Sequence, residues 1–166
     1  METKWYVFYV ASRQEKKVAE RISKLEITCY LPLAKKLRTW SDRKKWVDFP
    51  MFSGYVFVNG SLNTIDLVLN VPGVIQIISH CGSYATVRQK EIEIIRIVEE
   101  SGYYAETIYG VDDFNEGDQL QIVEGPLKGN KVSLLRKNNE RIFLIAFEQL
   151  GQSIKMNIPF EMLGKS

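Results

Sequence analysis

The chain has 166 residues, of which 45% are hydrophobic and 25% are charged, so it can hold one ordinary domain or two small ones and is too apolar to be disordered. Its formal net charge of +2 argues against a protein coated with positive charge for bulk nucleic-acid binding. No secretory signal and no bilayer-length apolar run are present, so we expect a cytoplasmic protein. Cys29 and Cys81 lack metal or redox spacing, and we expect both to be reduced.

The first predicted element is a strand over residues 4–10, with both faces apolar, as is typical of a strand in the middle of a sheet. Its side chains alternate between faces. Ser12 and Glu15 have the spacing of a capping box, which predicts a helix to about Leu25. The two faces of the strand are Trp5, Val7 and Tyr9 on one side and Tyr6, Phe8 and Val10 on the other.

A strand is expected over residues 27–33, and residues 35–46 predict a strongly basic hairpin or loop. Trp40 and Trp46 lie among its charges. Most charge runs are solvated surfaces. The alternative is contact with phosphates, in which the tryptophans stack on bases or brace the loop. The sequence leaves these two interpretations open.

Residues 49–59 predict a strand that is central to the fold, followed by a turn at Asn59-Gly60. Alternation places Tyr55 and Phe57 on one face and Val56 and Val58 on the other. An aromatic pair in a strand is usually core. A sheet covered by helices on only one side would instead present these rings as an apolar docking surface.

Further along, the pattern predicts a short helix at 64–69, a strand at 74–78, a return strand at 85–87 and a helix at 89–100 that Gly102 ends. The single histidine, His80, lies in a turn without metal-ligand partners. Residues 1–102 therefore predict a domain with an antiparallel sheet and helices.

Residues 103–115 show no regular pattern and predict a linker. Residues 116–166 then change to short alternating segments separated by glycine-rich or asparagine-rich turns, which predicts a small β-barrel. The fold class is therefore α+β, with a C-terminal barrel. The predicted barrel strands are 119–123, 131–135, 141–147 and 154–158.

Several of these segments resemble one known family. Lys4-Trp5-Tyr6-Val7, Phe52-Ser53-Gly54-Tyr55-Val56-Phe57-Val58 and Val71-Pro72-Gly73-Val74 are similar to the N-terminal domain of NusG-type transcription elongation factors. Gly117-Asp118-Gln119-Leu120 with Val123-Glu124-Gly125-Pro126-Leu127-Lys128-Gly129 resembles the KOW motif, in the position where that family carries its second domain. The short chain is more similar to specialised members, such as RfaH and the UpxY antiterminators of capsule operons.

The resemblance implies that an aromatic face of the N-terminal domain binds the clamp helices of RNA polymerase, holds the clamp closed and suppresses pausing or termination. Tyr9, Tyr55 and Phe57 lie at the matching positions. Aromatic anchors at the centre of an interface suit such a contact. Specific long operons, such as those for capsular polysaccharide, are the expected targets of a specialised member.

The resemblance also implies that basic residues face upstream DNA or the exposed non-template strand. Phosphate contacts of this kind position a protein without reading sequence. The candidate nucleic-acid-binding residues are Arg13, Lys16, Lys17, Lys35, Lys36, Arg38, Arg43, Lys44 and Lys45.

In the KOW segment, Gly125 and Gly129 fit a tight loop in which side chains would clash. The resemblance implies that the loop with Leu150 contacts a small-subunit ribosomal protein or a termination factor.

The alternative function is that of an RNA- or ribosome-binding KOW protein. An enzyme is not expected, because no carboxylate pair, nucleophile-base set or phosphate-cradling loop is visible. We expect no cofactor and no metal.

Overall fold

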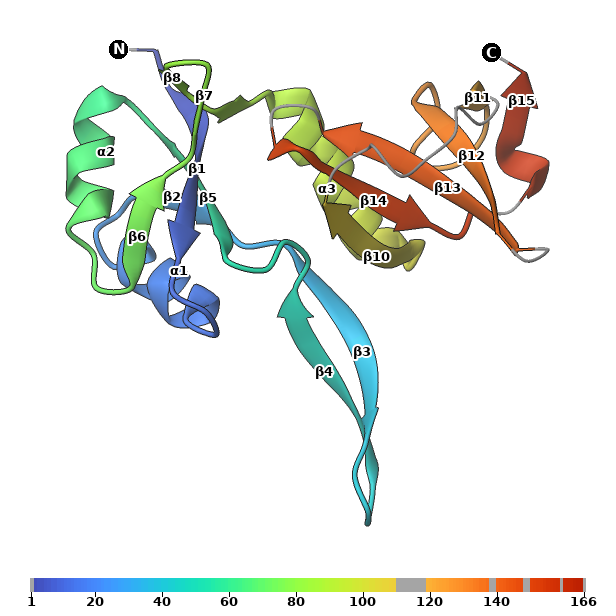
Figure 1. The fold of residues 1–166 in the computed structure, drawn as a ribbon, viewed down its shortest axis with the longest axis horizontal. Helices are drawn as coiled ribbons and strands as arrows, with labels where there is room; N and C mark the ends of the chain where they lie inside the picture. Colours follow the sequence, from blue (N-terminus) through green and yellow to red (C-terminus); the bar gives the residue numbers. More distant parts are fainter. Residues whose placement is uncertain (1, 110–118, 138–139, 148–149, 159, 166) are drawn as a thin grey trace. The chain divides into compact units, whose positions relative to one another are not determined.

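A computed structural model describes residues 2–109, 119–137, 140–147, 150–158 and 160–165. The chain divides into two compact units, residues 1–89 and 90–166. Figure 1 shows the helices and strands of each unit, coloured along the sequence. No helix in the described residues is both long and apolar enough to span a bilayer.

The first unit is built on an antiparallel sheet in the order β2-β5-β1-β6, with β9 also paired to β1. The predicted strand at 4–10 is confirmed as β1, and α1 and α2 cover one side of the sheet. The elements of this part are β1 Lys4–Val10, α1 Glu15–Ser23, β2 Thr28–Tyr30, β5 Tyr55–Gly60, α2 Leu62–Leu69, β6 Val74–Ile77 and β9 Thr86–Val87.

The register of β1 against β5 fixes which side chains share a face, because directly paired residues of an antiparallel sheet point the same way. Val7 pairs with Phe57 and Tyr9 pairs with Tyr55. The opposite face forms a buried cluster with α1 and α2. That cluster contains Tyr6, Phe8, Val10, Val18, Ile22, Val56, Val58, Ile65, Val68 and Val71.

The predicted basic hairpin is confirmed. Leu33–Thr39 forms β3 and Lys44–Pro50 forms β4, and the two strands pair only with each other in a separate two-stranded sheet. Figure 1 shows this hairpin projecting from the rest of the first unit. The expected continuous strand over 49–59 is wrong, since a turn separates β4 from β5. A second small hairpin is made by β7 Ser79–His80 and β8 Ser83–Tyr84.

The predicted capping box at Ser12 is also wrong. The residue before α1 is Gln14, which makes no side-chain capping bond, and α1 begins at Glu15. The helix ends at Ser23, two residues before the predicted end at Leu25, and Leu25 is exposed. At the start of α2, the Thr64 hydroxyl accepts a hydrogen bond from the Ser61 backbone N–H at 3.1 Å.

The second unit contains α3 and an antiparallel six-stranded sheet in the order β10-β14-β13-β12-β11-β15. The predicted helix at 89–100 and the four predicted C-terminal strands are confirmed. The elements are α3 Gln89–Ser101, β10 Tyr104–Tyr109, β11 Gln119–Ile122, β12 Lys131–Lys137, β13 Glu140–Phe147, β14 Gln152–Met156, the 3₁₀ helix η2 Phe160–Met162 and β15 Leu163–Lys165.

Two strands of this sheet were not expected. β10 lies in the predicted linker and pairs with β14 over five residue pairs, so this part of 103–115 is sheet. The rest of the predicted linker, 110–115, is outside the described residues. β15 pairs with β11 and forms the other end of the strand order.

Candidate functional site

The candidate aromatic site is the ring pair of Tyr9 and Tyr55 at the ends of β1 and β5. Their centroids are 6.1 Å apart with the ring planes at 72°, an edge-to-face arrangement. Tyr9 is 39% exposed and Tyr55 is half-buried. Two neighbouring rings on paired strands give a rigid apolar surface with hydroxyl groups that can hydrogen bond.

Gly54 allows this arrangement. Its φ is +80°, a conformation that favours glycine, and an added Cβ would lie 2.7 Å from Cε2 of Tyr9. The ring of Tyr9 therefore packs directly over the glycine backbone. The Gly54 carbonyl accepts a hydrogen bond from the Val10 N–H at 2.8 Å, which ties the turn to the end of β1.

Glu15 also holds this turn. Its carboxylate Oε1 accepts a hydrogen bond from the Gly54 N–H at 2.9 Å, and the Glu15 side chain is buried. The sequence pattern predicted a helix-capping role for Glu15 and did not predict this one. The sequence signal was an acidic residue at the start of a helix. The structure pairs that residue with a glycine 39 positions away.

Phe57 does not belong to the exposed surface, and the expectation that it would is wrong. It is fully buried, with its ring centroid 5.6 Å from that of Phe52 and 6.3 Å from that of Tyr30. Met51 and Phe52, in the turn before β5, are also buried. Phe57 therefore supports the strand that carries Tyr55 and cannot itself contact a partner.

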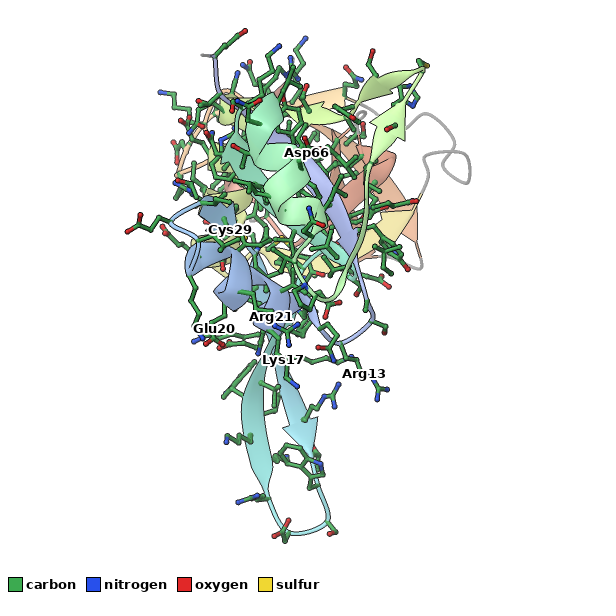
Figure 2. All side chains as sticks on the ribbon, turned by 90° about the vertical axis from the view of Figure 1, so that its left-hand side faces the viewer. Arg13, Lys17, Glu20, Arg21, Cys29 and Asp66 are labelled. Atoms are coloured by element: carbon green, nitrogen blue, oxygen red, sulfur yellow. The ribbon has the colours of Figure 1, made fainter. Side chains whose placement is uncertain are left out.

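The second candidate site is basic. Figure 2 shows Arg13, Lys17 and Arg21 at the end of the first unit from which the hairpin projects. Lys16 links this helix to the hairpin, because its ammonium donates to the Asp48 carbonyl at 2.8 Å. Arg21 donates to the Pro72 carbonyl at 2.6 Å and so holds the turn after α2.

The hairpin carries the remaining predicted basic residues, and all of them are exposed. At its tip, the Arg43 guanidinium lies 5.9 Å from the centroid of the Trp40 ring, a cation–π geometry that braces the turn. The Trp40 N–H donates to the Arg43 carbonyl at 2.8 Å. The structure thus brings the predicted basic residues together on α1, the turn before it and an adjoining hairpin. The hairpin set is Lys35, Lys36, Arg38, Arg43, Lys44 and Lys45.

The KOW-like loop connects β11 to β12. Gly125 and Gly129 have φ values of +82° and +91°, so both need the conformational freedom of glycine. An added Cβ at Gly125 would lie 3.2 Å from the Met162 sulfur, but nothing lies within 4 Å at Gly129, where the expected clash is wrong. Leu150 is buried, at 9% exposure, so its predicted role as a surface contact is not supported by its position.

In the part of the chain that the structure describes, no group of three or more His, Cys, Asp or Glu side chains could hold a metal ion. Cys29 and Cys81 are both free, and burial raises the pKa of the Cys29 thiol to about 12. A thiol with such a pKa stays protonated and weakly nucleophilic.

Comparisons with known proteins agree with this architecture. The family model described as "Transcription termination factor nusG" matches residues 3–96, which is more than half of the chain. No curated protein matches the chain.

Among solved structures, NusG of Thermotoga maritima, from work on its domain interaction, is similar with a TM-score of 0.61 and 23% identity. The match covers 99% of this chain and 98% of that one. Two conformations of the MjSpt4:Spt5 complex match with TM-scores of 0.35, at 17% and 18% identity, over 96% of this chain and 96% and 95% of those chains. Because the matching family model covers more than half of the chain, the chain belongs to the NusG family of transcription factors.

Proposed function

We propose that this chain is an elongation and antitermination factor that docks on RNA polymerase through Tyr9 and Tyr55 and places its basic hairpin on nucleic acid. The observation that carries the proposal is the edge-to-face pair of Tyr9, which is exposed, and Tyr55, which is half-buried, at the ends of β1 and β5. Membership of the family supports a polymerase as the partner for this surface, and we propose its clamp helices as the specific contact.

The surface has the properties of a small interface hot spot. Its rings are edge-to-face at 6.1 Å, and the turn beneath them is fixed by Glu15. Because this support already exists in the free chain, binding does not have to order the rings. Preorganisation lowers the entropic cost of association. Truncation of a hot-spot aromatic residue typically costs about 2 kcal/mol or more, which is roughly thirtyfold in affinity.

The proposed mechanism is a population shift without chemistry. A factor that binds the closed-clamp, active state of the polymerase better than the paused state moves the equilibrium by its differential affinity alone. The basic residues of α1 and the hairpin then hold DNA next to the docked domain, since phosphate contacts orient a protein without reading sequence. Capsular polysaccharide operons remain the expected targets of such a specialised member.

The test is retention of core RNA polymerase by the purified chain, followed by transcription of a paused template. We expect Tyr9→Ala with Tyr55→Ala to reduce retention about thirtyfold or more and to remove the effect on pausing. Tyr84→Ala is the matched control, because Tyr84 is an exposed tyrosine on β8, outside the candidate site.

Wild-type chain that retains no polymerase would refute the proposal. RNA binding without polymerase retention would favour the alternative, an RNA- or ribosome-binding KOW protein.

A further inference from the structure

The strand β10 closes one end of the sheet in the second unit. The order of that sheet is β10-β14-β13-β12-β11-β15, so β10 supplies the second neighbour of β14. The other five strands all come from residues 119–165, the KOW-like segment and the residues that follow it. β10 comes from residues 104–109, ahead of that segment. It is therefore an added strand, and it covers an edge that the other five strands would leave open.

β10 is attached mainly through its backbone. It pairs with β14 over five residue pairs, and a register shift between Tyr104 and Glu106 interrupts the ladder. Of the four side chains of Tyr104–Thr107, the first and last are half-buried and the middle two are exposed. A strand with few buried apolar contacts separates from a fold at a lower free energy than the strands of its core.

β14, in contrast, is fixed in the core of the second unit. The side chains of Ile154 and Met156 on this strand are fully buried. An ion pair joins β14 to β10, with 3.0 Å between Lys155 and Glu106, but Glu106 is 62% exposed. An ion pair as open to water as this contributes little to stability. Release of β10 would therefore leave the buried contacts of β14 in place.

Two residues of β14 have polar atoms that are not satisfied while β10 is paired. The side-chain amide of Gln152 and the hydroxyl of Ser153 are buried, and neither forms a hydrogen bond with any part of the chain that the structure describes. In the register they lie opposite Tyr109 and Ile108 of β10. Buried polar atoms without partners destabilise the state that contains them. This destabilisation applies to the six-stranded sheet, and it is relieved if release of β10 gives these atoms water or a new partner.

The N-terminal end of β10 has a latch and a hinge. The Tyr103 carbonyl accepts a hydrogen bond from the Asn157 N–H at 2.9 Å, and the Tyr103 hydroxyl donates to the Met162 sulfur at 3.4 Å. Gly102, between α3 and this latch, has a φ of +75° and no atom within 4 Å of an added Cβ. A glycine in open space can change its backbone angles without a clash. β10 can therefore turn away at Gly102 once the two bonds of Tyr103 break.

We propose that β10 is an autoinhibitory strand, which holds the edge of β14 closed and must leave before an extended segment of another protein can pair with β14. The proposal goes beyond the proposed function, since it concerns neither the tyrosine pair nor the basic hairpin. An added strand binds chiefly through main-chain hydrogen bonds, and its side chains provide specificity. The ammonium of Lys155 favours a segment with a carboxylate at the position opposite it, which Glu106 occupies in β10.

The experiment measures binding of a fluorescein-labelled peptide with the sequence of residues 103–109 to the full-length chain, with a scrambled peptide as the control. All proteins carry Cys81→Ser, because Cys81 is an exposed thiol. In the test variant, Glu106→Cys and Lys155→Cys allow a disulfide across the two strands. Directly paired residues of antiparallel strands have Cα atoms about 4.5–5.5 Å apart, which lies within the range for a disulfide.

The oxidised test variant keeps β10 in place, and we expect it to bind the peptide at least about tenfold more weakly than the same protein after reduction. The matched control is Thr39→Cys with Lys44→Cys, a directly paired and exposed position in the first unit, where oxidation should leave peptide binding unchanged. Equal binding by the oxidised and reduced test variant, including no binding by either form, would overturn the proposal, because the peptide would then not use the edge that β10 covers.

Hydrogen exchange of the unmodified chain gives a second measurement that needs no variant. The Asn157 amide donates to the Tyr103 carbonyl of the latch, whereas the Ile122 amide, at the end of β11, donates to the Asn130 carbonyl at 2.9 Å. After correction for intrinsic rates, release of β10 predicts that the Asn157 amide exchanges at least about tenfold faster than the Ile122 amide. Similar rates for the two amides would mean that β10 opens only when the whole unit unfolds, and the proposal would be wrong.

Discussion

The carboxylate of Glu15 accepts a hydrogen bond from the backbone N–H of Gly54 at 2.9 Å, so the first turn of α1 fixes the turn on which the Tyr9 ring rests. This bond joins residues 39 positions apart. It connects a helix start, a glycine and the candidate aromatic site in one structural unit. The position of the Tyr9 ring can therefore be perturbed through Glu15, whose side chain is buried.

Glu15→Ala leaves the Gly54 N–H buried without its acceptor, which we expect to lower the free energy of unfolding by about 1–3 kcal/mol. Glu15→Gln keeps an oxygen acceptor and should lose less. Urea denaturation measures both. The control is Glu20→Ala, because Glu20 forms an i,i+4 ion pair with Lys24 at 2.9 Å that is exposed to solvent and so contributes little to stability. Equal losses for Glu15→Ala and Glu20→Ala would contradict the structural role of Glu15.

Gly54→Ala should destabilise the protein and weaken polymerase retention together. The substitution adds a Cβ at positive φ, which costs about 1–2 kcal/mol, and it pushes against the Tyr9 ring. Gly82→Ala separates the two effects. Gly82 has a φ of +77° but has no atom within 4 Å of an added Cβ, so only the conformational cost remains. A loss at Gly54 no larger than at Gly82 would show that the ring contact is unimportant.

Phe57→Ala should lower the free energy of unfolding by about 3–5 kcal/mol, since it removes a fully buried ring from the contact with Phe52 and Tyr30. Leu62→Ala should change it by about 0.5 kcal/mol or less. Chemical denaturation followed by circular dichroism gives both values. A stable Phe57→Ala variant that no longer retains polymerase would instead make Phe57 a contact residue.

Period-two alternation predicted that Tyr55 and Phe57 share a face, and the resemblance implied that Tyr9 lies with them. The register of β1 and β5 confirms that all three side chains are on one face of the sheet. Alternation could not predict exposure, because cover comes from segments distant in sequence. Tyr30 and the turn at Phe52 close over Phe57, whereas Tyr9 stays open. The face on which a side chain lies is decided within its own strand, whereas its burial depends on the distant segments that pack over that face.

The capping-box error has the same origin. A serine followed three residues later by a glutamate fits a local cap, but the Glu15 carboxylate finds its donor across the fold. Likewise β10 shows little alternation and is a strand because β14 supplies its partner. The basic hairpin was predictable, since charge and turn residues act locally. Which of its side chains share a face depends on the register of β3 against β4.

The two cysteines should react very differently. Burial raises the pKa of Cys29 to about 12, whereas Cys81 is exposed. At pH 8 a thiol reagent should label Cys81 rapidly and Cys29 only as the protein opens. In Cys81→Ser, rapid labelling should disappear. Fast labelling of the remaining thiol in that variant would show that Cys29 is accessible.

The same shift predicts a pH dependence of stability. A raised folded-state pKa means that the folded chain keeps the thiol proton while the unfolded chain, with a value near 9.0, loses it. The contribution is fully present below pH 9 and falls as the pH rises from about 9 toward 12. Cys29→Ala should lack this component when both proteins are denatured over that pH range, and an identical slope for both would contradict it.

Lys45→Glu should stabilise the hairpin while weakening its binding to nucleic acid. The change converts the repulsion with Arg38 into an attraction, and cross-strand charge pairs contribute about 0.2–1 kcal/mol. The Trp40 amide, which donates to the Arg43 carbonyl at the end of the ribbon, reports this by hydrogen exchange. We expect its protection to rise by up to about fivefold. Lys45→Gln, which removes the repulsion without adding attraction, should give an intermediate value. A gain in the local stability of the hairpin together with a loss of affinity for nucleic acid would show that the like-charge pair serves binding, because it does not stabilise the free hairpin.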